Sequence, residues 1–99
     1  MSAFKEFIDK GFKDDVLPFH NELVLHRDVD NYRYTIYIDP EEGVAFYKSK
    51  LITGTTMEEC DKQLEEHEGA KIWVAPVDIV ELAVKLYKEL LEVKNGRFY

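Results

Sequence analysis

The sequence predicts a small α+β domain in which a mainly antiparallel sheet has helices packed on one face, in the order α-β-β-β-α-β-α. Three observations predict it: amphipathic helical spacing towards both ends of the chain, two adjacent strand-like segments joined by a tight turn, and a length of 99 residues. At this size about 65% of the extended-chain surface can be buried on folding. We therefore expect residues 1–99 to form a single domain.

The first segment, residues 2–13, places four apolar side chains at helical spacing, namely Phe4, Phe7, Ile8 and Phe12. Charged residues fill the other side, so the pattern predicts a short amphipathic helix. Residues 22–28 are typical of a strand, and residues 28–31 of a turn.

Residues 32–39 and 44–51 are rich in aromatic and β-branched side chains, which favour strands. Pro40 to Gly43 predicts a tight hairpin between them. With a four-residue loop, Ile36 faces Tyr47 and Ile38 faces Ala45 on the core side. The outer side then carries Arg33, Thr35, Tyr37, Phe46, Lys48 and Lys50.

Residues 57–68 predict a second helix, because Thr55 or Thr56 with a glutamate three residues later forms a capping box. This helix holds a net charge of −5 out of −7 for the whole chain. Its expected inner stripe is Met57, Cys60, Leu64 and His67. The expected outer residues are Glu58, Glu59, Asp61, Glu65, Glu66 and Glu68. We expect Cys60 to be an inert core residue.

Residues 71–74 predict a buried or edge strand, and pairing with 44–51 would make a right-handed strand-helix-strand crossover. A third helix is predicted over 78–94, with a polar stripe and an apolar surface wider than one sheet face covers. We expect a second partner for it, either the N-terminal helix or a copy of itself. The expected homodimer interface is Val80, Val84, Leu86, Tyr87, Leu90 and Leu91.

Several function classes lack their motifs. The single cysteine excludes an intramolecular disulfide framework and Cys-rich metal sites, and the five isolated glycines form no phosphate-binding loop. We expect no metal, no cofactor and no enzymatic activity, although an active site built from distant residues would leave no local motif. With no apolar signal core and no long apolar run, we also expect a cytoplasmic protein without membrane contact.

Two functional hypotheses remain. In the first, the protein is a small acidic adaptor or inhibitor that binds a basic protein partner. It binds through the acidic residues of the second helix, Glu58, Glu59, Asp61, Glu65 and Glu66, and in one version these residues mimic a nucleic acid. In the second, a nucleic-acid-binding sheet face uses Arg33, Tyr37, Phe46, Lys48 and Lys50. The net charge of −7 favours the first, because nucleic-acid-binding domains are usually basic.

The predicted order α-β-β-β-α resembles that of double-stranded-RNA-binding domains, and residues 51–59 are similar in outline to small antitoxins of the HicB type. Neither resemblance transfers a functional residue to this chain, so the sequence assigns no family.

Overall fold

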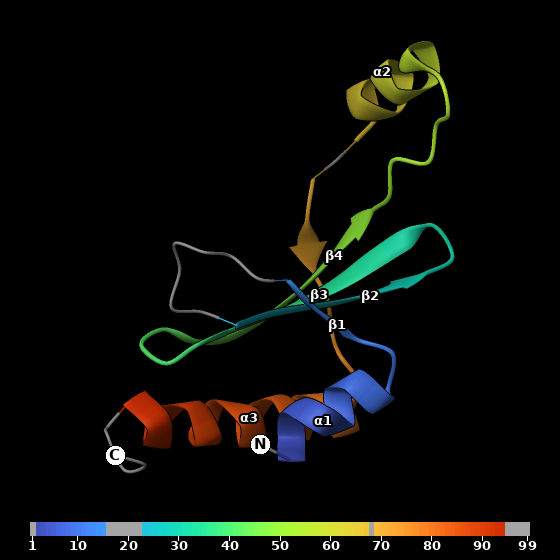
Figure 1. Ribbon diagram of the computed structural model, residues 1–99. Helices are drawn as coiled ribbons and strands as arrows, with labels where there is room; N and C mark the ends of the chain where they lie inside the picture. Colours follow the sequence, from blue (N-terminus) through green and yellow to red (C-terminus); the bar gives the residue numbers. More distant parts are fainter. Residues whose placement is uncertain (1, 16–22, 68, 95–99) are drawn as a thin grey trace.

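The computed structural model describes residues 2–15, 23–67 and 69–94, which form three helices and one five-stranded antiparallel sheet. The elements are α1 (Ser2–Asp9), β1 (Lys13–Asp15), β2 (Leu23–Val29), β3 (Tyr32–Asp39), β4 (Gly43–Lys50), α2 (Met57–Glu65), β5 (Lys71–Ile72) and α3 (Val77–Lys94). The strands lie side by side in chain order, from β1 to β5 (Figure 1). The predicted α+β class is confirmed, and β1 is a strand that the sequence did not predict. Glu22 and Glu68, expected in a strand and in the acidic helix, lie outside the described residues.

The core lies between one face of the sheet and the helices α1 and α3 (Figure 1). Its buried apolar residues include Phe7 and Phe12 from the N-terminal segment, Leu25 and Ile36 from the sheet, and Leu86 from α3. The rings of Phe7 and Phe12 meet edge to face with their centroids 5.4 Å apart. The two helices also touch each other, and Lys10 Nζ lies 3.5 Å from Asp78 Oδ2. The N-terminal helix is therefore an intramolecular partner of α3.

The helix α1 is shorter than expected, because the chain turns at Gly11 with a φ of +93° that favours glycine. Its amphipathic character is confirmed, with Ala3 and Phe7 buried. The turn between β2 and β3 also lies where the sequence predicts it. Val29 pairs with Tyr32, so Asp30 and Asn31 form a two-residue loop, with Asp30 at a φ of +56°.

The predicted register of the β3–β4 hairpin is wrong by one residue. Ile36 lies opposite Phe46 and Ile38 opposite Val44, because Asp39 pairs with Gly43 and the loop has three residues. Gly43, the first residue of β4, has a φ of +102°, a value that favours glycine directly after this loop. The carboxylate of Asp39 accepts a 2.8 Å hydrogen bond from the backbone N–H of Glu41 and closes this loop.

This register turns Phe46 towards the helices, where it packs against the core beside Trp73. It also puts Lys48 and Lys50 on the same face, since side chains two residues apart share a face. Both lysines are nevertheless exposed. The helices α1 and α3 cover the part of this face that lies away from α2 (Figure 1). Ile36 and Ile38 are buried, whereas the two lysines are not, so the slip buries no charge.

The strand β5 pairs antiparallel with β4, with Tyr47 opposite Ile72 and Lys48 opposite Lys71. The expected right-handed crossover is therefore wrong, because that rule applies to parallel strands. The reason is the path of the connection: α2 stays beyond the end of the sheet from which β4 leaves, and the chain re-enters from that same end (Figure 1). The strand β5 lies at the edge of the sheet, which is one of the two alternatives that the sequence predicted.

The helix α2 does not pack on the sheet but stands away from it (Figure 1). Two arms join it to the sheet: a first arm of residues 51–56, and a second arm whose described residues are 66, 67, 69 and 70. This placement makes the chain elongated. Its radius of gyration is 15.6 Å, against about 13 Å for a compact domain of this length. Its accessible surface is 7161 Å², against roughly 5,800 Å² for a compact monomer of this mass. No helix among the described residues is long and apolar enough to cross a membrane.

Candidate functional site

The start of α2 is fixed by its own sequence. The hydroxyl of Thr56 accepts a 3.1 Å hydrogen bond from the backbone N–H of Glu59, so Thr56 is the N-cap residue. In return, the Glu59 carboxylate accepts a 2.9 Å bond from the backbone N–H of Thr55. This arrangement confirms the predicted capping box, with the glutamate reaching one residue further back than usual.

The flank of α2 that faces the first arm is closely fitted to it. The side chain of Gln63 accepts hydrogen bonds of 2.9 Å from the backbone N–H groups of Thr53 and Gly54, and donates a 3.2 Å bond to the Thr53 hydroxyl. The thiol of Cys60 donates to the carbonyl of Gly54 at 3.3 Å. A Cβ atom on Gly54 would lie only 2.8 Å from Cβ of Glu59, so the close approach requires glycine.

A histidine connects the C-terminal end of α2 to the sheet. His67 Nδ1 accepts a 2.9 Å hydrogen bond from the backbone N–H of Gly69. Because Nδ1 accepts, the ring proton of the neutral imidazole is on Nε2, which donates to the carbonyl of Lys50 at 3.0 Å. His67 thereby attaches the second arm to Lys50, the last residue of β4.

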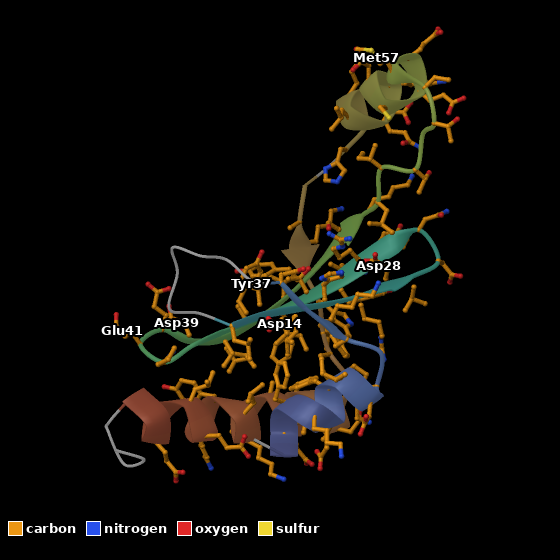
Figure 2. The ribbon with its side chains drawn as sticks, in the orientation of Figure 1. Asp14, Asp28, Tyr37, Asp39, Glu41 and Met57 are labelled. Carbon is orange, nitrogen blue, oxygen red and sulfur yellow. The ribbon has the colours of Figure 1, made fainter. Side chains whose placement is uncertain are left out.

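The rest of α2 is open to solvent. Met57 is 83% exposed and Leu64 is 59% exposed, and α2 has no buried residue. The expected inner stripe is therefore wrong, because the stripe has no sheet to cover. Figure 2 shows Met57 at the end of the molecule furthest from α1 and α3. Cys60 is not a core residue either, but half-buried against the first arm.

All five acidic residues predicted to bind a partner are exposed on α2 or at its C-cap: Glu58, Glu59, Asp61, Glu65 and Glu66. At 100° per residue, Glu58, Asp61 and Glu65 lie along one flank of the stripe formed by Met57 and Leu64. Cys60 and Gln63 lie on its other flank, towards the arm. Glu59 also supports the helix start, so only part of the predicted set is free of a structural role.

The predicted homodimer surface on α3 is largely used within the chain. Leu86 is 0% exposed, and Tyr87 and Leu90 pack against the core. Leu91 is half-buried, whereas Val80 and Val84 are exposed. Substituting Leu86 would therefore test the fold and not self-association. The polar stripe expected on α3 is exposed as predicted: Asp78, Glu81, Lys85, Lys88 and Glu92.

The predicted nucleic-acid face is divided between the two sides of the sheet, because the register differs. Arg33 and Tyr37 lie on the side away from α1 and α3, where Figure 2 labels Tyr37. Phe46, Lys48 and Lys50 lie on the other side. Arg33 forms two hydrogen bonds to Asp28, of 2.8 and 3.1 Å, which lower the pKa of the Asp28 carboxyl.

One pair of residues was not predicted from the sequence. Asp15 of β1 and His26 of β2 meet with 2.6 Å between Oδ2 and Nδ1, and His26 is 9% exposed. The carboxylate fixes the ring proton on Nδ1, an arrangement that also orients catalytic histidines. Within the described residues, no hydroxyl or thiol is hydrogen-bonded to His26 Nε2, and the contact fastens the short strand β1 to β2. Because β1 was not predicted, nothing in the sequence indicated that Asp15 and His26, which are 11 positions apart, are in contact.

No group of three or more His, Cys, Asp or Glu side chains in the described ranges is arranged to hold a metal ion. The feature of this structure that stands apart from the core is therefore α2 with its arms. No known protein family, curated protein or solved structure matches the chain.

Proposed function

We propose that this protein is a small non-enzymatic regulator that binds another protein through α2. The observation that carries the proposal is the placement of α2: its cap and its arm contacts hold it in position, yet it buries none of its residues. A helix held in this way has already lost much of the conformational freedom that binding would otherwise remove. Exposed apolar side chains next to charged ones are typical of a surface that a partner covers.

The surface of α2 also indicates the chemistry of its partner. Met57 and Leu64 suit an apolar groove that takes one face of a helix. Glu58, Asp61 and Glu65 would then meet basic residues along one rim of that groove. A protein with such a groove is the expected partner, and an acidic helix of this kind can act as an adaptor or as an inhibitor of a nucleic-acid-binding protein.

The first test reverses charge on α2 without changing its cap. The variant Glu58→Lys, Asp61→Lys, Glu65→Lys is compared with a control of equal charge change, Glu6→Lys, Glu42→Lys, Glu81→Lys, at exposed positions elsewhere. Each tagged protein captures partners from nuclease-treated lysate of the source cell, and the main partner is purified and titrated. We expect the α2 variant to bind that partner about tenfold or more weakly, and the control to bind like the wild type. If the α2 variant and the control bound the partner with the same affinity, α2 would not be the binding surface.

A second test addresses the apolar stripe. Leu64→Asp adds a charge to the stripe, and Ile8→Asp does the same at an exposed apolar position on α1. We expect only Leu64→Asp to weaken the complex, with an unchanged circular dichroism spectrum in both cases. Loss of binding in Ile8→Asp alone would place the interface on α1.

Self-association is part of the proposal, on a smaller surface than the sequence indicated. Val77, Val80 and Val84 follow each other at helical spacing and are exposed on α3. Light scattering after size exclusion should find a dimer that Val80→Asp with Val84→Asp dissociates, and a monomeric wild type would refute it. We place the protein in the cytoplasm, where Cys60 stays a thiol that can donate to Gly54.

A further inference from the structure

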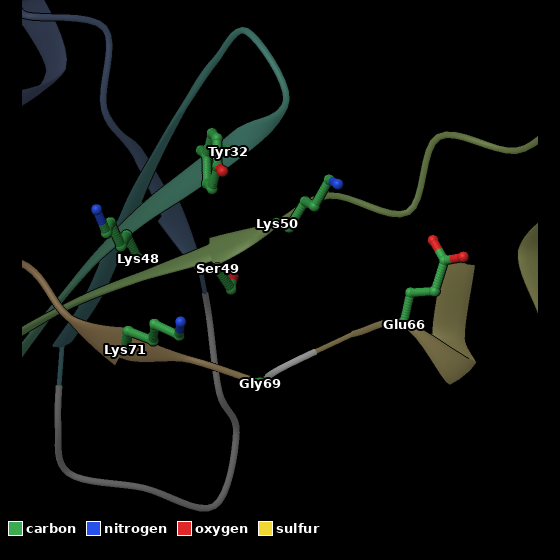
Figure 3. A pocket seen from close by; sticks show the side chains of 7 residues that line it. All are labelled: Tyr32, Lys48, Ser49, Lys50, Glu66, Gly69 and Lys71. Atoms are coloured by element: carbon green, nitrogen blue, oxygen red, sulfur yellow. The ribbon is translucent and has the colours of Figure 1, made fainter. Parts of the chain in front are cut away.

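The end of the sheet next to α2 contains a basic pocket that is separate from the acidic flank of the helix. Its volume is about 340 Å³. It is lined by Tyr32, Lys48, Ser49, Lys50, Glu66, Gly69 and Lys71 (Figure 3). Three of these seven residues are lysines and one is acidic, in a chain whose net charge is −7. The described lining residues therefore carry a net charge opposite in sign to that of the whole molecule.

The three lysines lie close together because of the strand register. Lys48 is directly opposite Lys71 across the β4–β5 pair, and Lys50 is two residues along β4 on the same face. Like charges directly opposite each other on neighbouring strands are destabilising. In the described part of the chain, neither Lys48 nor Lys50 forms an ion pair. An anion bound beside Lys48 and Lys50 would supply the counter-charge that these two side chains lack among the described residues.

An aromatic ring lies in the same pocket. Tyr32 is opposite Lys50 in the β3–β4 register and is 41% exposed, so it is accessible to a ligand. Lysines beside an exposed ring are the combination that binds a phosphate together with a stacked base. The pocket volume also lies in the range of small-molecule sites.

We propose that the pocket formed by Lys48, Lys50, Lys71 and Tyr32 binds a nucleotide, with the lysines on its phosphates and Tyr32 against its base. The nucleotide can be free or part of a single-stranded nucleic acid, since the two share this chemistry. Glu66 at the end of α2 lines the same pocket. The bound phosphate must therefore lie towards β4 and β5, away from that carboxylate.

Trp73 allows the site to be tested without a label on the protein. It is the single tryptophan, two residues after Lys71, and its ring centroid is 4.8 Å from that of Tyr34, which pairs with Lys48. The probes are inorganic pyrophosphate, uridine triphosphate and a fluorescein-labelled oligothymidylate. Trp73 fluorescence reports on the first two and anisotropy on the third, at low and moderate salt.

We expect uridine triphosphate or the oligonucleotide to bind more tightly than pyrophosphate, with affinity that falls as salt rises. Lys48→Gln with Lys71→Gln should weaken binding about tenfold or more, because two charged contacts are lost. The matched control, Lys85→Gln with Lys88→Gln on α3, should bind like the wild type. Tyr32→Leu should remove the preference over pyrophosphate.

Each other outcome is also informative. Tighter binding of uridine triphosphate identifies a free nucleotide as the ligand, and tighter binding of the oligonucleotide identifies a single strand. Equal binding of all three probes would overturn the nucleotide proposal, as would binding of none or equal losses in both lysine variants. Charge reversal on α2 leaves these lysines in place, so failure of the protein-binding proposal would not affect this test.

Discussion

Replacing Gly54 with alanine should detach α2 from its arm and leave the core intact. The added Cβ would lie 2.8 Å from Cβ of Glu59 and 2.9 Å from the backbone nitrogen of Cys60. Carbon atoms in contact prefer about 3.5 to 4.0 Å, so a shift of about 0.7 Å or more is needed. Both neighbouring atoms belong to the first turn of α2 and not to the end of a flexible side chain, so the helix itself must move.

The expected cost is that of overpacking, about 1 to 3 kcal/mol. The same movement would also disturb the bonds from Gln63 to Thr53 and Gly54 and from Cys60 to the Gly54 carbonyl. The population with α2 open should therefore rise about tenfold or more. Since α2 contacts no other helix or strand of the described chain, the free energy of unfolding of the sheet should not change.

Two residues that each occur once in the chain serve as probes. The labelling rate of the Cys60 thiol reports on opening of the arm, and Trp73 fluorescence during urea unfolding reports on the sheet. We expect Gly54→Ala to speed labelling about tenfold and to leave the urea midpoint unchanged. Gly43→Ala is the reciprocal control: its φ of +102° disfavours alanine, so it should lower the urea midpoint. Unchanged labelling, or parallel changes in both probes for Gly54→Ala, would refute the reasoning.

Three further predictions concern stability. Leu86→Ala should lower the free energy of unfolding by about 2 to 5 kcal/mol, and Leu64→Ala should lower it by less than about 1 kcal/mol, because only Leu86 is buried. Equal losses for the two variants in urea unfolding would contradict the separation of α2 from the core. Asp30→Gly should raise the free energy of unfolding by about 0.5 to 1 kcal/mol, and with it the melting temperature, because glycine tolerates the φ of +56° at this position. A lower melting temperature would contradict this explanation. The bonds from Arg33 lower the pKa of the Asp28 carboxyl in the folded state from its ordinary value of 3.8. These bonds therefore contribute up to about 1 kcal/mol to the free energy of unfolding above pH 3.8, a small value because the pair is exposed. This contribution is lost as the pH falls through the pKa of the folded state. The stability difference between wild type and Asp28→Asn, measured by urea unfolding, should therefore vanish in acid, and a difference that grows there would contradict the assignment.

The structure also restricts how the acidic residues of α2 can be interpreted. Glu59 contributes to the cap and Gln63 to the arm, so substitutions at these positions change the helix as well as any binding surface. Glu58, Asp61 and Glu65 have no such role among the described contacts. A loss of binding in their lysine variants can therefore be assigned to the surface itself.

The sequence by itself determined the features that depend on neighbours in the chain. The positions of three helices and of the strands around the turns at Asp30 and at Pro40 follow from hydrophobic periodicity and turn residues. The cap of α2 at Thr56 follows from a hydroxyl and a carboxylate three residues apart. These interactions form within a few residues, so local sequence is enough to predict them.

The tertiary structure decided the features that depend on residues far apart. The predicted hairpin loop and the observed one differ in length by one residue. In the structure the loop is the shorter one, and Phe46 packs beside Trp73. The resulting register divides the predicted nucleic-acid face between the two sides of the sheet. The position of α2 beyond the sheet exposes Met57, although its helical spacing is that of an inner stripe. Periodicity shows which side chains share a face, but whether another element covers that face depends on the path of the whole chain.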